Sequence, residues 1–329
     1  MSSEIMVQAN NITKFYGEYP AISNVSFTAN KGEIIGFLGP NGSGKTTTMR
    51  ILTGYMPASS GDATIAGYDV ANQSLEAKQH VGYLPENAPL YTDMKVNEYL
   101  TFTGKIRGMT KTAIKSRLDE IIEICRLQEY RNTIIGKLSK GFRQRVGIAQ
   151  AIIHQPDVLI LDEPTIGIDP IQVVETRSLI KEIGGDSTII LSSHILPEVS
   201  AICERVIIIN DGEIVAVDSP ENLSNRLEAT ERIRIEALGK TSDMVSVFRN
   251  NPSVQDVNFE TLDDGKIIFD IISKGGLEIR SELAKSVIDN GWSLYNLQAV
   301  SLSLEDIFLR LTTNEEEIFE EKKWKISLQ

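Results

Sequence analysis

Residues 39–47 read Gly-Pro-Asn-Gly-Ser-Gly-Lys-Thr-Thr and fit the phosphate-binding loop pattern G-x-x-x-x-G-K-[ST]. The apolar run at 33–38 predicts a buried strand leading into this loop, and residues 45–52 predict a helix that ends near Gly54. Glycines let the backbone N–H groups of such a loop turn toward a phosphate, and the positive end of the helix favours its negative charge. An ordinary glycine turn is the alternative, but the flanking strand and helix favour a nucleotide site.

The side chains of this loop would share the phosphate chemistry. We expect Lys45 to bridge the β- and γ-phosphates of a nucleotide, and Thr46 to hold Mg²⁺ through its hydroxyl. The residues expected to contact the nucleotide in this loop are Gly39, Pro40, Asn41, Gly42, Ser43, Gly44, Lys45, Thr46 and Thr47.

Two adjacent acids, Asp162 and Glu163, follow a predicted buried strand at 158–161. Sheets of α/β proteins gather their ligands at the carboxyl ends of strands. We expect Asp162 to contact Mg²⁺, often through water, and Glu163 to polarise the attacking water as a general base. Two acids at a strand end can also form a solvated turn, but the phosphate loop upstream favours the functional interpretation.

Aliphatic runs at 158–161, 188–191 and 206–209 are separated by helical stretches, which predicts a parallel sheet with crossover helices. Alternating residues on both sides of Tyr16-Gly17 predict short antiparallel strands. Residues 95–151 are mainly helical in pattern. We therefore expect an α/β fold of the P-loop NTPase type, with an antiparallel β subdomain and a helical subdomain near 88–150, within a domain at 1–220.

A more specific pattern lies between these motifs, where residues 138–145 read Leu-Ser-Lys-Gly-Phe-Arg-Gln-Arg. This segment resembles the signature motif of ABC ATPases, and the other marks of that family stand in its order. Tyr16 is similar to the aromatic residue that stacks on adenine, Asp169 stands in a D-loop-like segment, and His194 matches the switch histidine. The resemblance covers residues 1 to about 220.

The resemblance implies ATP hydrolysis in a head-to-tail dimer that holds two ATP molecules between its subunits. Ser139 would cap the helix whose positive end, with Gly141, closes on the γ-phosphate held by a second subunit. Glu163 and His194 would be catalytic, and Asp169 would lie at the nucleotide. ATP and Mg²⁺ are the implied cofactors. The implied partners are a second copy, or a homologous ATPase subunit, and an integral-membrane permease.

Three residues depart from the usual pattern of the family. Lys140 stands where glycine is usual, and Phe142 where glutamine is usual. Glu86 takes the place of the Q-loop glutamine and is the third candidate magnesium contact beside Thr46 and Asp162. These variants resemble a narrower branch, the ATP-binding subunits of ABC-2-type exporters, particularly the gliding-motility-associated kind.

After Pro220 the sequence pattern changes to strands near 232–237, 254–260, 266–272 and 292–300, with helices near 242–250 and 277–290. This βαββαβ order predicts a small ferredoxin-like α+β domain at 221–311. We expect a closing helix at 303–311, and a flexible acidic tail at 312–329.

Composition narrows the choice of partners. Residues 1–220 carry 20 Lys and Arg against 25 Asp and Glu, and the remainder carries 13 against 20, so both parts are acidic. No broad basic surface is expected, which argues against nucleic acid as a ligand. Cys125 and Cys203 are the two cysteines of the sequence, so we expect no disulfide framework and a reducing compartment. No run approaches the roughly 18 apolar residues of a membrane span, and no secretory signal is evident.

We therefore expect a cytoplasmic protein, peripheral at the inner face of the cell membrane, that drives export through a separate permease. The alternative is an ABC ATPase with a non-transport role, acting on ribosomes or DNA. Such proteins usually carry two ATPase cassettes or a long coiled-coil insertion, and this chain shows one cassette and no sustained heptads.

Overall fold

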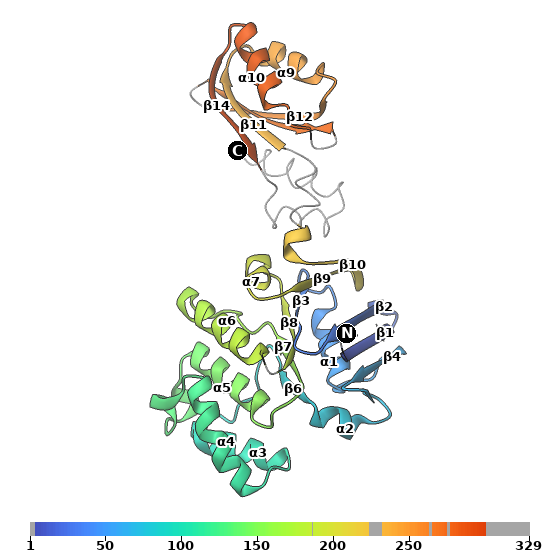
Figure 1. Ribbon diagram of the computed structural model, residues 1–329, viewed down its shortest axis with the longest axis vertical. Coiled ribbons are helices and arrows are strands. Elements are labelled where there is room, and N and C mark those ends of the chain that lie inside the picture. Colours follow the sequence, from blue (N-terminus) through green and yellow to red (C-terminus); the bar gives the residue numbers. More distant parts are fainter. Residues whose placement is uncertain (1–3, 186, 224–231, 263–264, 275–276, 301–329) are drawn as a thin grey trace. The chain divides into compact units, whose positions relative to one another are not determined.

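The computed structural model describes residues 4–185, 187–223, 232–262, 265–274 and 277–300. Its contacts divide the chain at Pro220 into two compact units (Figure 1). Each unit has its own sheet system and its own buried core. In the described part of the chain, no helix has both the length and the apolarity needed to cross a membrane.

The first unit begins with an antiparallel sheet in the order β2-β1-β4-β5. Its strands are β1 (Ile5–Tyr16), β2 (Tyr19–Asn30), β4 (Ser60–Ile65) and β5 (Tyr68–Asp69). The β1–β2 hairpin turns at Gly17, whose φ of 62° lies in the left-handed region that glycine tolerates best. The predicted antiparallel strands around Tyr16-Gly17 are therefore confirmed.

A second sheet carries the site and has six strands in the order β10-β9-β3-β8-β7-β6. They are β3 (Ile34–Leu38), β6 (Val81–Leu84), β7 (Val158–Asp162), β8 (Thr188–Ser193), β9 (Arg205–Asn210) and β10 (Glu213–Asp218). Strands β6, β7, β8, β3 and β9 run parallel, as expected, and β10 pairs antiparallel with β9. The antiparallel edge strand β10 was not predicted from the sequence.

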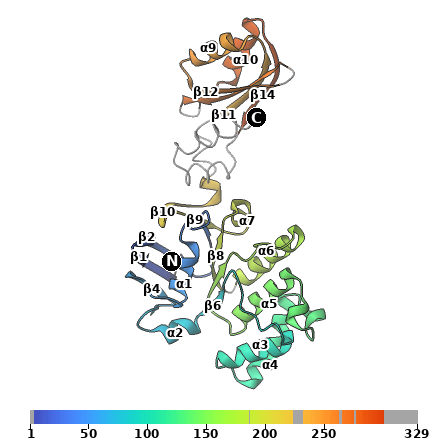
Figure 2. The same ribbon diagram turned by 180° about the vertical axis from the view of Figure 1, so that it is seen from behind.

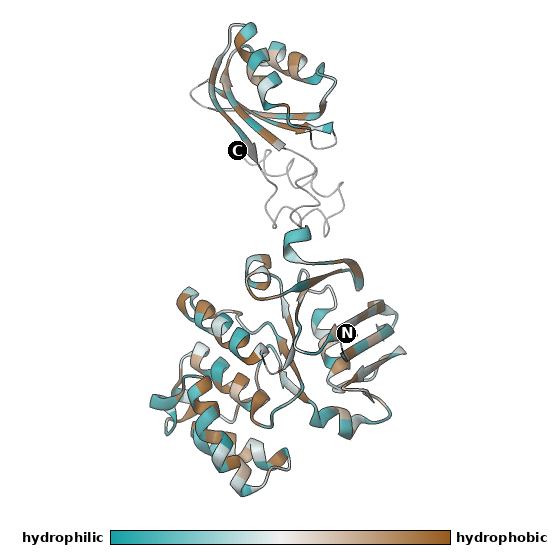
Figure 3. Cartoon of the chain, in the orientation of Figure 1, coloured by the Kyte–Doolittle hydropathy of each residue, from teal (hydrophilic) through white to brown (hydrophobic). Residues whose placement is uncertain are grey.

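Helices separate and cover these sheets (Figure 2). They are α1 (Lys45–Leu52), α2 (Ser74–Gln79), α3 (Val96–Ile106), α4 (Lys111–Ile124), α5 (Lys140–Ile152), α6 (Pro170–Gly184) and α7 (Leu196–Ser200), with short 3-10 turns at Gln128–Tyr130 and Ile135–Lys137. Helices α3, α4 and α5 contact one another and form the expected helical subdomain. Figure 3 shows hydrophobic and hydrophilic residues mixed on α5 and α6, the pattern of helices with one covered face.

The core of the first unit lies between its two sheets, with α1 packed against both. Ile35 and Phe37 of β3 and Met49 and Leu52 of α1 are fully buried in it. On the opposite face of the six-stranded sheet, Gly36 leaves room for α7, because a Cβ at this position would overlap Val199. Close approach of helices to both faces holds β3, and the loop that follows it, in a fixed position.

The second unit contains a four-stranded antiparallel sheet in the order β12-β13-β11-β14. Its elements are β11 (Arg232–Leu238), α9 (Thr241–Arg249), β12 (Val254–Thr261), β13 (Ile267–Ser273), α10 (Arg280–Asp289) and β14 (Ser293–Val300). This βαββαβ order with β11 and β13 in the centre is the ferredoxin-like arrangement expected from the sequence. The predicted helix at 303–311 and the acidic tail at 312–329 lie outside the described residues.

Phe248 is the centre of the second unit's core. It is fully buried, and its ring lies 5.0 Å from that of Phe269 and 6.5 Å from that of Trp292. Every residue of this core cluster lies after residue 232. The second unit is therefore expected to unfold without the first.

We predict that Phe248→Ala lowers the free energy of unfolding of the second unit by about 3–5 kcal/mol, because it leaves a cavity in that core. Both tryptophans of the chain, Trp292 and Trp324, lie after Pro220. Urea unfolding followed by tryptophan fluorescence would thus report this change. Phe259→Ala removes a ring that is 48% exposed and is the matched control. An equal loss in both variants, or loss of ATP binding in Phe248→Ala, would contradict the prediction.

Candidate nucleotide-hydrolysis site

The loop after β3 folds around the side chain of Lys45. The Nζ of Lys45 donates hydrogen bonds to the carbonyl oxygens of Gly39 (2.7 Å) and Pro40 (3.1 Å). A Cβ at Gly39 would overlap the backbone of Ile209 and the hydroxyl of Ser43, and Gly44 has a φ of 104°. Glycine is therefore required at both positions for the loop to curl into a cradle of backbone N–H groups.

Asp162 ends β7 and meets the first turn of α1. Its Oδ1 accepts hydrogen bonds from the hydroxyls of Ser192 (2.6 Å) and Thr46 (3.2 Å). Its Oδ2 is buried and has no hydrogen-bond partner among the described residues. Burial raises the pKa of Asp162, and the hydrogen bonds from Ser192 and Thr46 oppose that shift. A cation would satisfy this buried oxygen, so the arrangement of Asp162 and Thr46 fits a divalent metal ion with oxygen ligands.

Glu163 lies between a cation and an imidazole. Its Oε1 lies 3.5 Å from the Nζ of Lys45, and its Oε2 lies 3.0 Å from the Nδ1 of His194. Lys45 and Glu163 are nearly buried, with side chains 6% and 7% exposed. Glu163 has a φ of 50°, a left-handed conformation that is uncommon for residues other than glycine. The backbone therefore turns sharply at this residue, and its N–H donates to the hydroxyl of Ser192 (2.9 Å).

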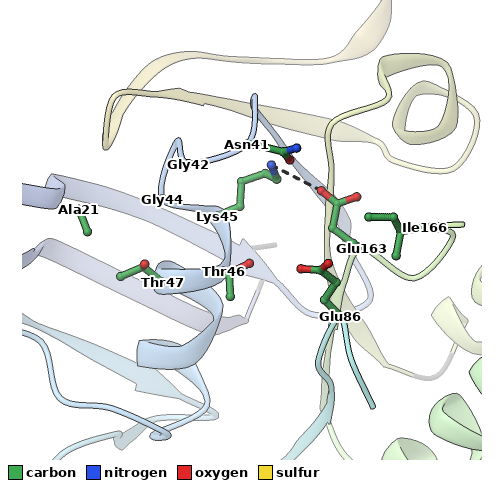
Figure 4. Close-up of a pocket in the computed structure, with 10 residues that line it drawn as sticks. All are labelled: Ala21, Asn41, Gly42, Gly44, Lys45, Thr46, Thr47, Glu86, Glu163 and Ile166. Carbon is green, nitrogen blue, oxygen red and sulfur yellow. Dashed lines mark ion pairs between the residues drawn. The ribbon is translucent and has the colours of Figure 1, made fainter. Parts of the chain in front are cut away.

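A cavity of about 330 Å³ opens over the loop (Figure 4) and is lined by most of the expected loop residues, but not by Gly39, Pro40 or Ser43. Its lining residues are Ala21, Asn41, Gly42, Gly44, Lys45, Thr46, Thr47, Glu86, Glu163 and Ile166. In Figure 4, Glu86 and Glu163 extend into this space from one side, and the phosphate loop bounds the other. The structure thus brings Glu86 to the same cavity as Thr46.

Tyr16 stands apart from this cavity, at the end of β1. Its side chain is 46% exposed, and its hydroxyl donates to the sulfur of Met56 at 3.3 Å. An exposed aromatic face beside a phosphate loop can stack on a base, but Tyr16 is not among the residues that line the cavity.

Ser139, Gly141 and Asp169 form a separate group at two helix N-termini. The Ser139 hydroxyl accepts a hydrogen bond from the N–H of Phe142 (3.3 Å) and caps α5. The Asp169 carboxylate accepts one from the N–H of Gln172 (3.0 Å) and caps α6. None of the three lines the cavity, so one chain does not bring the signature residues and the phosphate loop into one site.

Ser192 is the site residue that sequence reasoning did not single out. It bonds both to the Asp162 carboxylate and to the backbone of Glu163. A polar residue at the end of the aliphatic strand, two positions before His194, was the only available signal. Ser192 fixes the two acids relative to β8.

The chain matches known proteins along most of its length. A family model described as ABC transporter matches residues 22–166. The linearmycin resistance ATP-binding protein LnrL of Bacillus subtilis is 34% identical over 93% of this chain and 98% of its own length. The bacitracin transport ATP-binding protein BcrA of Bacillus licheniformis is 32% identical over 93% of this chain and 97% of its own.

A solved structure of an ATP-binding subunit of an ABC transporter is similar to 67% of the chain. It has a TM-score of 0.62 and 26% sequence identity, and 92% of that subunit is covered. The sequence relatives and the structural neighbour therefore indicate the same family. The phosphate loop, the acids at the end of β7 and the histidine after β8 lie in a fold of that family. The chain belongs to the ATP-binding proteins of ABC transporters, a family of ATP-hydrolysing cassettes.

Proposed function

We propose that this chain drives export through a separate integral-membrane permease of the ABC-2 type, by hydrolysing Mg-ATP in the cavity over its phosphate loop. The observation that carries the proposal is the Lys45–Glu163–His194 arrangement next to a buried oxygen of Asp162 that has no hydrogen-bond partner in the described part of the chain. The names of its relatives, which refer to linearmycin resistance and to bacitracin transport, support a transport role. The resemblance to the gliding-motility branch stays a prediction.

The residues in and around the cavity have the following roles in this proposal. Lys45 holds the β- and γ-phosphates, and Thr46, Asp162 and Glu86 are the residues that would hold Mg²⁺, which supplies positive charge against the phosphate oxygens. Glu163 takes a proton from the attacking water. His194 donates from Nδ1 to the second oxygen of the ionised Glu163 and so fixes the direction of that carboxylate. Tyr16 stacks on the adenine.

We predict that Glu163→Gln slows ATP hydrolysis by roughly 10²–10⁴-fold, because the amide cannot accept the proton of the water. ATP binding, measured with a fluorescent analogue, should persist. Glu182→Gln, an equal change at an exposed position of α6, is the control and should hydrolyse ATP normally. Near-normal turnover in Glu163→Gln would refute the general-base role.

The separation of Ser139 and Gly141 from the cavity motivates the dimer. The N-terminus of α5 presents backbone N–H groups and the positive end of a helix dipole, which suit a phosphate. A second copy arranged head to tail would bring its α5 to the γ-phosphate held by the first. Two ATP molecules would then lie between the subunits.

Mixed dimers test this arrangement. Ser139→Arg subunits combined with Lys45→Ala subunits retain one composite site, made by Lys45 of the former and Ser139 of the latter. We predict that nucleotide trapping finds one occupied site in these mixed dimers and that neither homodimer closes normally on ATP. Normal ATP-dependent closure of Ser139→Arg homodimers, measured by size-exclusion chromatography, would contradict the proposal.

A second cavity, of about 210 Å³, suits the permease. Its lining combines the aromatic and aliphatic side chains of Tyr91, Tyr99, Phe102 and Ile106 with polar side chains that include Arg107 and Gln150. Tyr91 and Ile106 are exposed, and exposed apolar surface of this kind is typical of a protein interface. A cassette held by a permease in this way works at the inner face of the cell membrane.

The unit after Pro220 is proposed as an accessory domain at 221–311 that supports the dimer or the permease contact. Every proposed catalytic residue lies before Pro220, and the two named relatives match 93% of the chain, so their similarity extends into this unit. Its separate core is consistent with a role outside ATP chemistry.

A further inference from the structure

Gln172 of α6 lies directly over Gly141 of α5. A Cβ added to Gly141 would overlap the carboxamide oxygen of Gln172 and would lie 3.3 Å from its nitrogen. The backbone of Gln172 is held at the start of α6, because its N–H donates a hydrogen bond to the capping carboxylate of Asp169. A larger residue at 141 would displace the carboxamide of Gln172 from this position.

Lys140 makes the reciprocal contact. Its side chain lies over Gly167, where an added Cβ would overlap the ammonium and would lie 3.4 Å from Cε and 3.8 Å from Cδ. Gly167 has a φ of 67°, which favours glycine. The glycine usual at position 140 in this family could not reach across to this turn, so the contact depends on a residue in which the chain departs from its family.

No charged partner accounts for the position of Lys140. Its ammonium forms no ion pair or hydrogen bond within the described part of the chain. A cation at the start of a helix is also repelled by the helix dipole. The ammonium nitrogen is nonetheless the atom nearest to Gly167, with Cε and Cδ behind it, so the end of this exposed side chain makes the contact.

A third contact joins the same two segments, the N-terminal part of α5 and residues 167–175, which together form the α5–α6 seam. Arg145, one turn further along α5 and nearly buried, forms an ion pair with Glu175 of α6. Helices α5 and α6 lie next to each other in both views (Figures 1 and 2). The N-terminus of α5 and the segment 167–175 are thus joined by two side chains seated on glycines and one ion pair.

The segment 167–175 follows the catalytic turn without a break. The N–H of Ile166 donates to the carbonyl oxygen of Glu163 at 3.2 Å, and Gly167 comes next. A displacement of the α5 N-terminus therefore reaches the backbone of Glu163 through Gly167. In the proposed dimer, the α5 N-terminus faces the neighbour's ATP, and Glu163 faces the ATP of its own chain.

We propose that Lys140 and Gln172 are positioning residues that couple the two ATP sites, by locking the signature helix to the turn that carries Glu163. This inference rests on the proposed function. Within each chain, contacts would lead from the α5 N-terminus, which faces the neighbour's ATP, to Glu163, the general base for the chain's own ATP.

Alanine variants test the connection in the full-length chain. Lys140→Ala and Gln172→Ala should each lower kcat by roughly 2- to 30-fold, the range for residues that lie between coupled sites. The Hill coefficient for ATP should fall toward one, and the affinity for a fluorescent ATP analogue should not change. Lys140→Met keeps the aliphatic stem and should restore kcat and the Hill coefficient. Lys137→Ala, an exposed lysine outside the seam, is the matched control.

A double-mutant cycle separates this role from direct phosphate contact. Gly141→Ala should displace Gln172 and lower kcat, and the double variant Gly141→Ala, Gln172→Ala should fall no further than the more impaired single variant, because both changes remove the same contact. If Gly141 served only close approach of a phosphate, the two losses would multiply, and the inference would be wrong. Unchanged Hill coefficients in both alanine variants would also overturn it.

The wild-type chain distinguishes this inference from the proposed function. A wild type that does not hydrolyse Mg-ATP refutes the proposed function itself. A wild type that hydrolyses ATP while Lys140→Ala and Gln172→Ala behave like Lys137→Ala refutes only the coupling.

Discussion

Parallel hydrogen bonding of β3 to β8, and of β8 to β7, is the constraint on which the site depends. The three strands end at the same edge of the sheet, and each is followed by part of the chemistry. Lys45 follows β3, Asp162 and Glu163 stand at the end of β7, and His194 follows β8. Because the strands are buried on both faces, their register cannot slip, and the four side chains are placed relative to one another with little freedom.

The charges of these buried side chains determine which partners they need. Two acids and one lysine are held in a nearly buried position, where an unpaired charge is costly. Lys45 interacts with Glu163 and with two loop carbonyl oxygens. Asp162 accepts from two hydroxyls, and its second oxygen has no hydrogen-bond partner within the ranges that the structure describes. A bound phosphate would be attracted to the positive charge of Lys45, and a bound cation to the negative charge of Asp162. Nucleotide and metal ion would therefore each neutralise a charge of the opposite sign in the site.

The sequence predicted the parts of the fold that are governed by local pattern. The long aliphatic runs identified the parallel strands, and the loop glycines identified the phosphate cradle. The βαββαβ order after Pro220 was also correct. The edge strand β10 was missed because its residues are only alternately half-buried and it follows β9 after a two-residue turn at Asp211-Gly212.

Side-chain contacts between distant segments were not predictable in this way. Gln172 gives no signal in the sequence that it would lie on Gly141, because the contact depends on how α5 and α6 pack. Ser192 looked like an ordinary end of a strand, although it bonds to the Asp162 carboxylate. In both cases the decisive information is the distance between elements, which periodicity does not contain.

The pairing of β3 also has a consequence for biosynthesis. Ile35 pairs with Ile190 on one side and with Arg205 on the other, so this strand gains neither neighbour until most of the first unit has been synthesised. During translation, the apolar strand β3 would therefore lack hydrogen-bonding partners until more than a hundred further residues have been added. Such non-local pairings form slowly. The nascent cassette is therefore expected to need protection from aggregation, and folding helpers at the ribosome would shield β3 until β8 and β9 arrive.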